Sequence, residues 1–86
     1  MTNYINLRYT IDMNSSANPK SQQKFGDNLR EIRTGKQLSQ EEVAKASGIS
    51  VTYYAGIERG EENPTFAVIE NICKALKVKS AQVLPY

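Results

Sequence analysis

The sequence contains no histidine and only one cysteine, Cys73, among its 86 residues. One cysteine cannot form an intramolecular disulfide, and the lack of histidine excludes a Cys/His zinc site. Histidine is also the usual general base of enzymes, so the composition favours a binding protein over an enzyme, with no metal and no cofactor. Cys73 falls on an expected apolar helix stripe, where we interpret it as a small buried hydrophobic residue.

Long apolar runs and a large excess of one charge are also missing. No run approaches the roughly 20 apolar residues that span a membrane, and no signal-peptide pattern opens the chain, so we expect a cytoplasmic protein. The 11 basic and 9 acidic residues give a net charge of only +2. Any affinity for a polyanion must therefore depend on where the basic residues lie.

The most informative stretch of the chain is Gln40 to Arg59, which reads QEEVAKASGISVTYYAGIER. Two short helices that cross at a tight turn need a small residue at the crossing and a residue that tolerates positive φ in the turn. Ala44 and Gly48 meet these two needs. The shared apolar core would consist of Val43, Ile49, Tyr54 and Ile57. The stretch therefore predicts a helix-turn-helix.

Capping signals predict where these two helices begin. Ser39 and Glu42 form a capping box, which places the first helix start at about Gln40, and Ser50 is a suitable N-cap for the second helix. The outer face of the second helix is left to Val51, Thr52, Tyr53, Ala55 and Gly56.

The flanking sequence predicts three more helices, which makes an all-α bundle of five. Helical signals begin near Ser21, and Gly35 offers a C-cap for the first helix. Thr65 can cap a fourth helix, and Ser80 a short fifth helix that ends near 84–85. The first helix would bury Phe25, Leu29 and Ile32, and the fourth would bury Ile69, Ile72, Cys73 and Leu76.

Residues 1–23 are expected to form an extension ahead of a single domain at 24–86. Apolar Ile5, Leu7, Tyr9 and Ile11 alternate with polar residues, which is the period of a strand, and a polar linker follows at 14–20. Residues 4–11 either pair as a strand with a second subunit or a partner, or form a disordered tail. A third alternative is that natural translation starts at Met13.

From about Phe25 to Leu84 the sequence resembles the lambda-repressor and Cro-like, or XRE-type, helix-turn-helix regulators. The strings LSQEEVAKASGIS and TYYAGIERGEENPT carry the resemblance, and the second is most similar to the controller proteins of restriction-modification systems. Ser47 departs from the family, which usually has an apolar residue or alanine there. We expect its hydroxyl to bond a backbone carbonyl one turn earlier.

In such a motif the start of the second helix reads base edges in the major groove. Val51 can contact thymine methyl groups, Thr52 can bond a base edge, and Tyr53 can donate its hydroxyl to a phosphate or a base. The simpler alternative is that these residues are only a solvent-facing surface. Gly56 is costly in a helix, and we expect it to allow close approach of the DNA backbone or of a partner side chain.

The resemblance also implies contacts with the DNA backbone. Gln40 matches a phosphate-contacting position at a helix N-terminus. Arg33 and Glu58 match a pair that forms a salt bridge between the first and third helices, with the arginine near the DNA. The remaining backbone candidates are Lys36, Ser50 and Arg59, with Lys45 as a weaker one. Controller-like relatives often have a base-reading basic residue after the ERG-like turn, where this chain has Glu61 and Glu62.

Family resemblance further implies a homodimer that binds two half-sites of double-stranded DNA about 10 bp apart. The last two helices are the usual interface, and here they carry Phe66, Val68, Ile69, Val78, Val83, Leu84 and Tyr86. Two alternatives remain: an antitoxin-type autoregulator whose N-terminal strand binds a toxin, and a helical interaction module that no longer binds DNA. The residues decide neither the operator sequence nor activation against repression.

Overall fold

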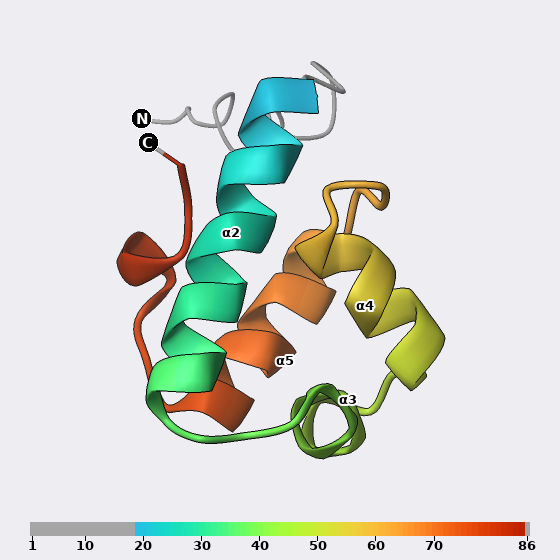
Figure 1. The fold of residues 1–86 in the computed structure, drawn as a ribbon, viewed down its shortest axis with the longest axis vertical. Helices are drawn as coiled ribbons and strands as arrows, with labels where there is room; N and C mark the ends of the chain where they lie inside the picture. The colour runs from blue at the N-terminus through green and yellow to red at the C-terminus, as the bar shows by residue number, and fades with distance from the viewer. Residues whose placement is uncertain (1–18, 86) are drawn as a thin grey trace.

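The computed structural model describes residues 19–85, which form four α-helices and one short 3-10 helix. They are α2 (Pro19–Gly35), α3 (Gln40–Ser47), α4 (Val51–Glu58), α5 (Phe66–Leu76) and η1 (Ser80–Gln82). Figure 1 shows α2 as the long helix, with α3, α4 and α5 on one side of it and the C-terminal segment on the other. The predicted strand at 4–11, linker residues 14–18 and Tyr86 lie outside the described residues, whereas residues 19 and 20, also predicted as linker, belong to α2.

Each α-helix contributes to a single core. Phe25 and Leu29 come from α2, and the rest of the buried cluster comprises Val43, Ala44, Tyr54, Ile57, Ile69, Ile72, Cys73, Leu76 and Val83. Of the four residues expected to form the core of the motif, Val43, Tyr54 and Ile57 are buried and Ile49 is half-buried against them. The predicted apolar stripe of α5 is also buried, including Cys73.

The start of α2 and the end of the chain differ from the sequence prediction. Pro19 is the first helical residue, a position proline favours because its missing N–H has no partner there. The predicted fifth helix is instead a single 3-10 turn at Ser80–Gln82, followed at once by buried Val83. Asn28 donates a 2.9 Å hydrogen bond to the carbonyl oxygen of Val83, which ties this segment to α2.

The chain leaves α2 through Gln37, not through Gly35. Gly35 is the last helical residue, whereas Gln37 adopts the left-handed conformation with φ of 60°. The left-handed backbone conformation costs a residue other than glycine about 1 kcal/mol. The amide of Leu38 donates to the carbonyl oxygen of Arg33 at 3.1 Å, and this bond closes the end of the helix. The predicted C-cap at Gly35 was therefore wrong.

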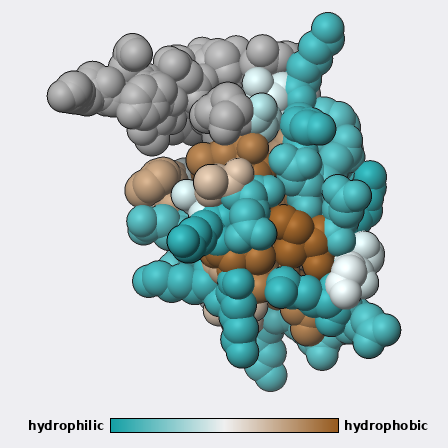
Figure 2. All heavy atoms as spheres, turned by 90° about the vertical axis from the view of Figure 1, so that its left-hand side faces the viewer, coloured by the Kyte–Doolittle hydropathy of each residue, from teal (hydrophilic) through white to brown (hydrophobic). Residues whose placement is uncertain are grey.

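Polar side chains cover most of the face that carries α2 and the C-terminal segment, and a strip of apolar atoms shows between them (Figure 2). Half-buried Ile32, Val78 and Leu84 pack against the core from its edges. None of the helices within residues 19–85 is long and apolar enough to cross a membrane.

Candidate nucleic-acid interface

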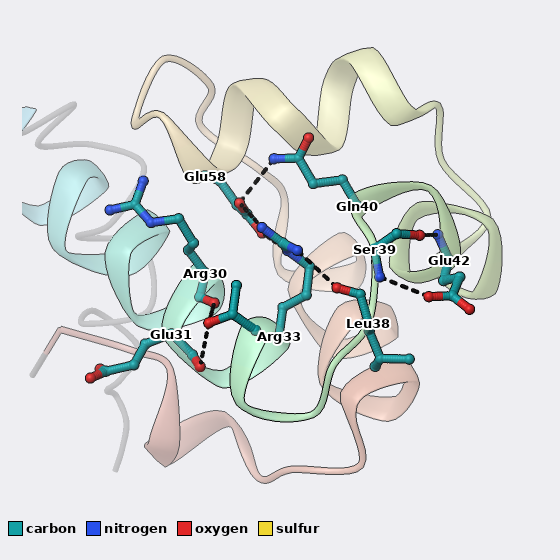
Figure 3. Close-up of polar contacts among 9 residues, drawn as sticks. Arg30, Glu31, Arg33, Leu38, Ser39, Gln40, Glu42 and Glu58 are labelled. Carbon is teal, nitrogen blue, oxygen red and sulfur yellow. Dashed lines mark hydrogen bonds and ion pairs between the residues drawn. The ribbon is translucent and has the colours of Figure 1, made fainter.

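A hydrogen-bonded network around Glu58 fixes α3 and α4 against α2. Arg33 on α2 donates from Nε to Glu58 Oε2 at 2.6 Å and from Nη2 to Oε1 at 3.1 Å. Its Nη1 donates to the carbonyl oxygen of Leu38 at 2.8 Å, ahead of α3. Gln40, the first residue of α3, donates from Nε2 to Glu58 Oε1 at 3.0 Å. Figure 3 shows these groups converging on one carboxylate.

The network keeps both charged groups ionised in a largely buried position. The Glu58 side chain is 2% exposed and that of Arg33 12% exposed. Burial, the largest influence, acts to raise the pKa of Glu58, but the hydrogen bonds from Arg33 and Gln40, together with the nearby Tyr54 hydroxyl, lower it overall. The hydrogen bond to Glu58 raises the pKa of Arg33. The Tyr54 hydroxyl is buried beside the pair, without a hydrogen bond of good geometry, and burial raises its pKa.

The turn between α3 and α4 has the predicted cap geometry. Ser39 accepts from the amide of Glu42 at 3.0 Å, and Glu42 accepts from the amide of Ser39 at 2.7 Å, which is a complete capping box. Gly48 has φ of 77°, and its N–H bonds to α3 carbonyl oxygens. Ser50 Oγ accepts from the amide of Tyr53 at 3.0 Å. Both helix starts are thus fixed by side chains.

The start of α4 presents Val51 and Thr52 to solvent. Val51 is 39% exposed, and within residues 19–85 it and Phe66 are the two large hydrophobic residues on the surface. Tyr53 is half-buried against the core, so its ring serves packing as well as any contact with DNA. Burial, and then the negative charge of Glu62, raise the pKa of Tyr53. The phenol therefore stays protonated and can donate.

Gly56 lies in a different environment from the one predicted. Gly56 was expected on the outer face of α4 but is buried. The side chain that approaches it is Glu62 of the same chain, whereas the sequence suggested the DNA backbone or a partner side chain. A Cβ added at Gly56 would lie 2.8 Å from Cγ of Glu62. Gly56 thus makes room for Glu62 in this structure.

The candidates for contacts with the DNA backbone differ in their exposure and in how many of their hydrogen-bond donors are already used within the protein. Lys36 and Lys45 are exposed, and Arg59 forms an exposed 3.0 Å ion pair with Glu61. Three donor atoms of Arg33 are already bonded, although a guanidinium carries five N–H groups. Gln40 has one N–H on Glu58 and a second amide hydrogen left over, since its NH2 group carries two. Ser50 accepts from its own helix and keeps its hydroxyl proton.

Two sequence expectations about individual residues were wrong. Ser47 is 4% exposed and its Oγ has no hydrogen-bond partner, so it does not bond a carbonyl one turn earlier. Among the apolar residues considered for the dimer interface, Val83 is 0% exposed and belongs to the core, and Ile69, 3% exposed, lies in the buried stripe that was also predicted for it. Phe66 remains on the surface at 50% exposure.

Sequence reasoning missed the role of Gly26. A Cβ at Gly26 would collide with the backbone carbonyl oxygens of Ile57 and Glu58, so α2 and the end of α4 touch through this glycine. The available signal was a glycine in mid-helix, where it costs about 1 kcal/mol relative to alanine and needs a packing reason. Nothing in the sequence indicated that the Glu62 side chain lies over Gly56. Gly56 belongs to α4 and Glu62 to the loop after it, so their contact depends on how this loop folds back onto the helix.

The two capped helices joined by a left-handed glycine, with the start of the second helix exposed, define a helix-turn-helix domain of the DNA-binding kind. The helix-turn-helix family model matches residues 29–83, and the chain belongs to this family. It is a transcriptional regulator of the XRE type, and its relatives are regulators, not enzymes.

Restriction-modification controllers are among its relatives. The chain is 40% identical over 63 residues to the control protein C.BamHI of Bacillus amyloliquefaciens, which covers 72% of this chain and 78% of that protein. It is 37% identical over 59 residues to the uncharacterized regulator y4dJ of Sinorhizobium fredii, covering 69% and 77%. The crystal structure of the restriction-modification controller C.AhdI from Aeromonas hydrophila matches with a TM-score of 0.71 and 40% identity, covering 72% of this chain and 94% of that one.

Proposed function

We propose that the protein binds a pseudo-palindromic operator as a homodimer and controls restriction-modification genes in the cytoplasm. The observation that carries this proposal is the exposed start of α4, held in place by the Arg33–Glu58 pair and the Ser50 cap. The control of restriction-modification genes is carried over from the similarity to C.BamHI and C.AhdI.

In the proposed complex α4 lies in the major groove, and its first residues face the bases. Val51 contacts a thymine methyl group and Thr52 bonds a base edge, while Tyr53 donates its hydroxyl to a base or to a phosphate. Phosphate contacts come from the groups around the motif. These groups are Arg33, Lys36, Gln40, Ser50 and Arg59, with Lys45 at the margin.

The exposed Phe66 at the start of α5 supports a dimer interface on that helix, because burying a half-exposed phenylalanine would stabilise the dimer. Val68, Val78 and Leu84 are half-buried and would extend the contact. Two copies related by a two-fold axis would place their α4 helices in successive major grooves, about 34 Å apart.

The test is selection of bound sequences from a random duplex pool at physiological salt. We expect an enriched palindrome whose half-sites are centred about 10 bp apart. The variant to compare carries Thr52→Ala and Tyr53→Phe, since phenylalanine preserves the packing of the half-buried ring. Thr34→Ala is the matched control, because the Thr34 hydroxyl bonds only carbonyl oxygens of its own helix. An enriched single half-site saturated by monomer would contradict the dimer, and no enrichment would contradict the proposed function.

A further inference from the structure

The exposed part of α4 consists of two residues. Of the eight residues in this helix only Val51 and Thr52 are exposed, whereas Tyr53 is half-buried and packs on the core. The one charged residue of α4 is Glu58, whose side chain is 2% exposed and paired with Arg33. The exposed surface of the helix therefore carries no charge and no side-chain amide, and a valine is its first residue.

Val51 is presented to solvent in a defined orientation. It is 39% exposed and does not belong to the residues that pack on the core. Ser50 accepts a 3.0 Å hydrogen bond from the amide of Tyr53, which fixes the backbone beside it. A valine in a helix has one strongly preferred rotamer, so its two methyl groups point in one direction. Because a valine side chain makes no hydrogen bonds, it adds affinity only for a ligand with an apolar group to bury.

The major groove of DNA offers one such group. Each base pair presents hydrogen-bonding atoms there, but only thymine also presents an apolar group, its C5-methyl. A cytosine methylated at C5 carries the same group on the same ring carbon, whereas unmodified cytosine lacks it. Val51 has no donor or acceptor that would distinguish the O4 oxygen of thymine from the N4 amino group of cytosine. Thr52 beside it imposes no such distinction, since a hydroxyl both donates and accepts.

We infer that Val51 makes the protein a reader of C5-methylated pyrimidines, so that one position of each half-site accepts thymine or 5-methylcytosine and disfavours unmodified cytosine. The inference rests on the proposed function, because it requires the start of α4 in the major groove. It goes beyond a thymine contact, since it makes operator affinity depend on the methylation of cytosine at that position. Methylation of the DNA would then change binding without any change of base sequence.

The test uses duplexes built on the palindrome that wild type selects. In the first series each thymine is replaced in turn by uracil, which lacks only the C5-methyl group. In the second series the thymine that responds is replaced by cytosine or by 5-methylcytosine, each paired with guanine. Affinities are measured at one salt concentration, and circular dichroism confirms that each protein is folded.

The proteins compared are wild type, Val51→Ala, Thr52→Ser and the control Thr34→Ala. Alanine shortens the exposed side chain at position 51. Serine removes the methyl group of Thr52 but keeps its hydroxyl, so this variant separates the two side chains as readers of the methyl group. The Thr34 hydroxyl bonds only carbonyl oxygens of its own helix, which makes it a suitable control.

We expect uracil to weaken binding by wild type and Thr34→Ala about fourfold for one substituted half-site and about fifteenfold for both, because one methyl group at each is no longer buried. Duplexes with 5-methylcytosine should bind more tightly than those with cytosine by the same factors. Both differences should be largely lost in Val51→Ala and kept in Thr52→Ser.

Equal affinity for thymine and uracil at every position would overturn the inference, and so would equal affinity for 5-methylcytosine and cytosine. Differences that disappear in Thr52→Ser but persist in Val51→Ala would assign the methyl contact to Thr52, and would overturn it as well. In each of these cases the enriched palindrome leaves the proposed function standing. If wild type enriches nothing, the proposed function fails and the inference fails with it.

Discussion

At the scale of single residues, Glu58 determines how the helix-turn-helix is held. Its carboxylate, 2% exposed, accepts hydrogen bonds from α2 and from the first residue of α3. The pairing with Arg33 was inferred from the family resemblance. Gln40 was expected to point at phosphate, and its bond to Glu58 was not foreseen, because the sequence does not indicate which of two acceptors a side-chain amide reaches.

Removing one partner of the Arg33–Glu58 ion pair should lower the free energy of unfolding more than removing a neutral hydrogen-bond donor to Glu58. We expect Arg33→Ala to lower the free energy of unfolding by about 3 kcal/mol, because it leaves the buried Glu58 carboxylate uncompensated. Gln40→Ala removes one neutral donor and should cost only about 1 kcal/mol. Urea denaturation of both variants measures the difference. Equal losses would mean that the ionic partner is not what stabilises Glu58.

Ser47 is a residue at which the sequence is not optimal for the fold. Its buried hydroxyl has no partner within the described structure, and an unsatisfied buried group costs about 1–3 kcal/mol. We expect Ser47→Ala to raise the free energy of unfolding by about 1 kcal/mol, helped by the helix propensity of alanine. Thermal denaturation tests this, with exposed Ser80→Ala as the control. A loss of stability would show that the Ser47 hydroxyl is satisfied in solution.

At the scale of helices, starts were easier to predict than ends. Ser39, Ser50 and Thr65 all cap as predicted, because an N-cap is a local bond between a side chain and an amide three residues later. Helix ends depend on where the chain must go next. Gln37 and Lys77 take the left-handed positions at φ of 60° although neither is glycine.

Three helical glycines should respond differently to alanine, and helix packing is the reason. Gly26→Ala should be strongly destabilising, by more than about 2 kcal/mol, because the new methyl group meets backbone atoms of α4 that cannot move away. Gly35→Ala meets nothing within 4 Å and should gain up to about 1 kcal/mol.

Gly56→Ala meets only the flexible Glu62 side chain, so it should change stability by less than about 1 kcal/mol. Thermal denaturation of the three variants gives the order directly. A Gly26→Ala protein as stable as wild type would contradict the close contact between α2 and α4.

At the scale of the whole molecule, the helical periodicity predicted most of the core, including the α5 stripe of Ile69, Ile72 and Leu76. It did not separate core from interface. Val83 was assigned to a dimer surface but is fully buried, because its burial depends on the path of the chain after α5. The proposed base contacts are predictions from the motif, and only their exposure and packing are visible in the structure.

The free energy of unfolding of the whole domain should fall at low pH, because Glu58 becomes protonated and loses its stabilising interactions. The pKa of Glu58 is lowered in the fold, so its contribution is fully present above the unfolded pKa of about 4.3 and is lost as pH falls through the folded value. We expect the free energy of unfolding to decline below about pH 4.3, and to decline less in Glu58→Gln. Glu61→Gln is the control, since Glu61 is exposed and should leave most of the decline in place. Identical pH profiles for Glu58→Gln and wild type would contradict this account.

The most direct test of the central claim, that α4 reads bases, is the ratio of affinities for the selected duplex and a scrambled duplex across a range of salt. We expect the Thr52→Ala, Tyr53→Phe protein to lose most of this ratio while the dependence of affinity on salt stays the same, because the phosphate contacts remain. An unchanged ratio would contradict the account, since sequence would then be read by another surface.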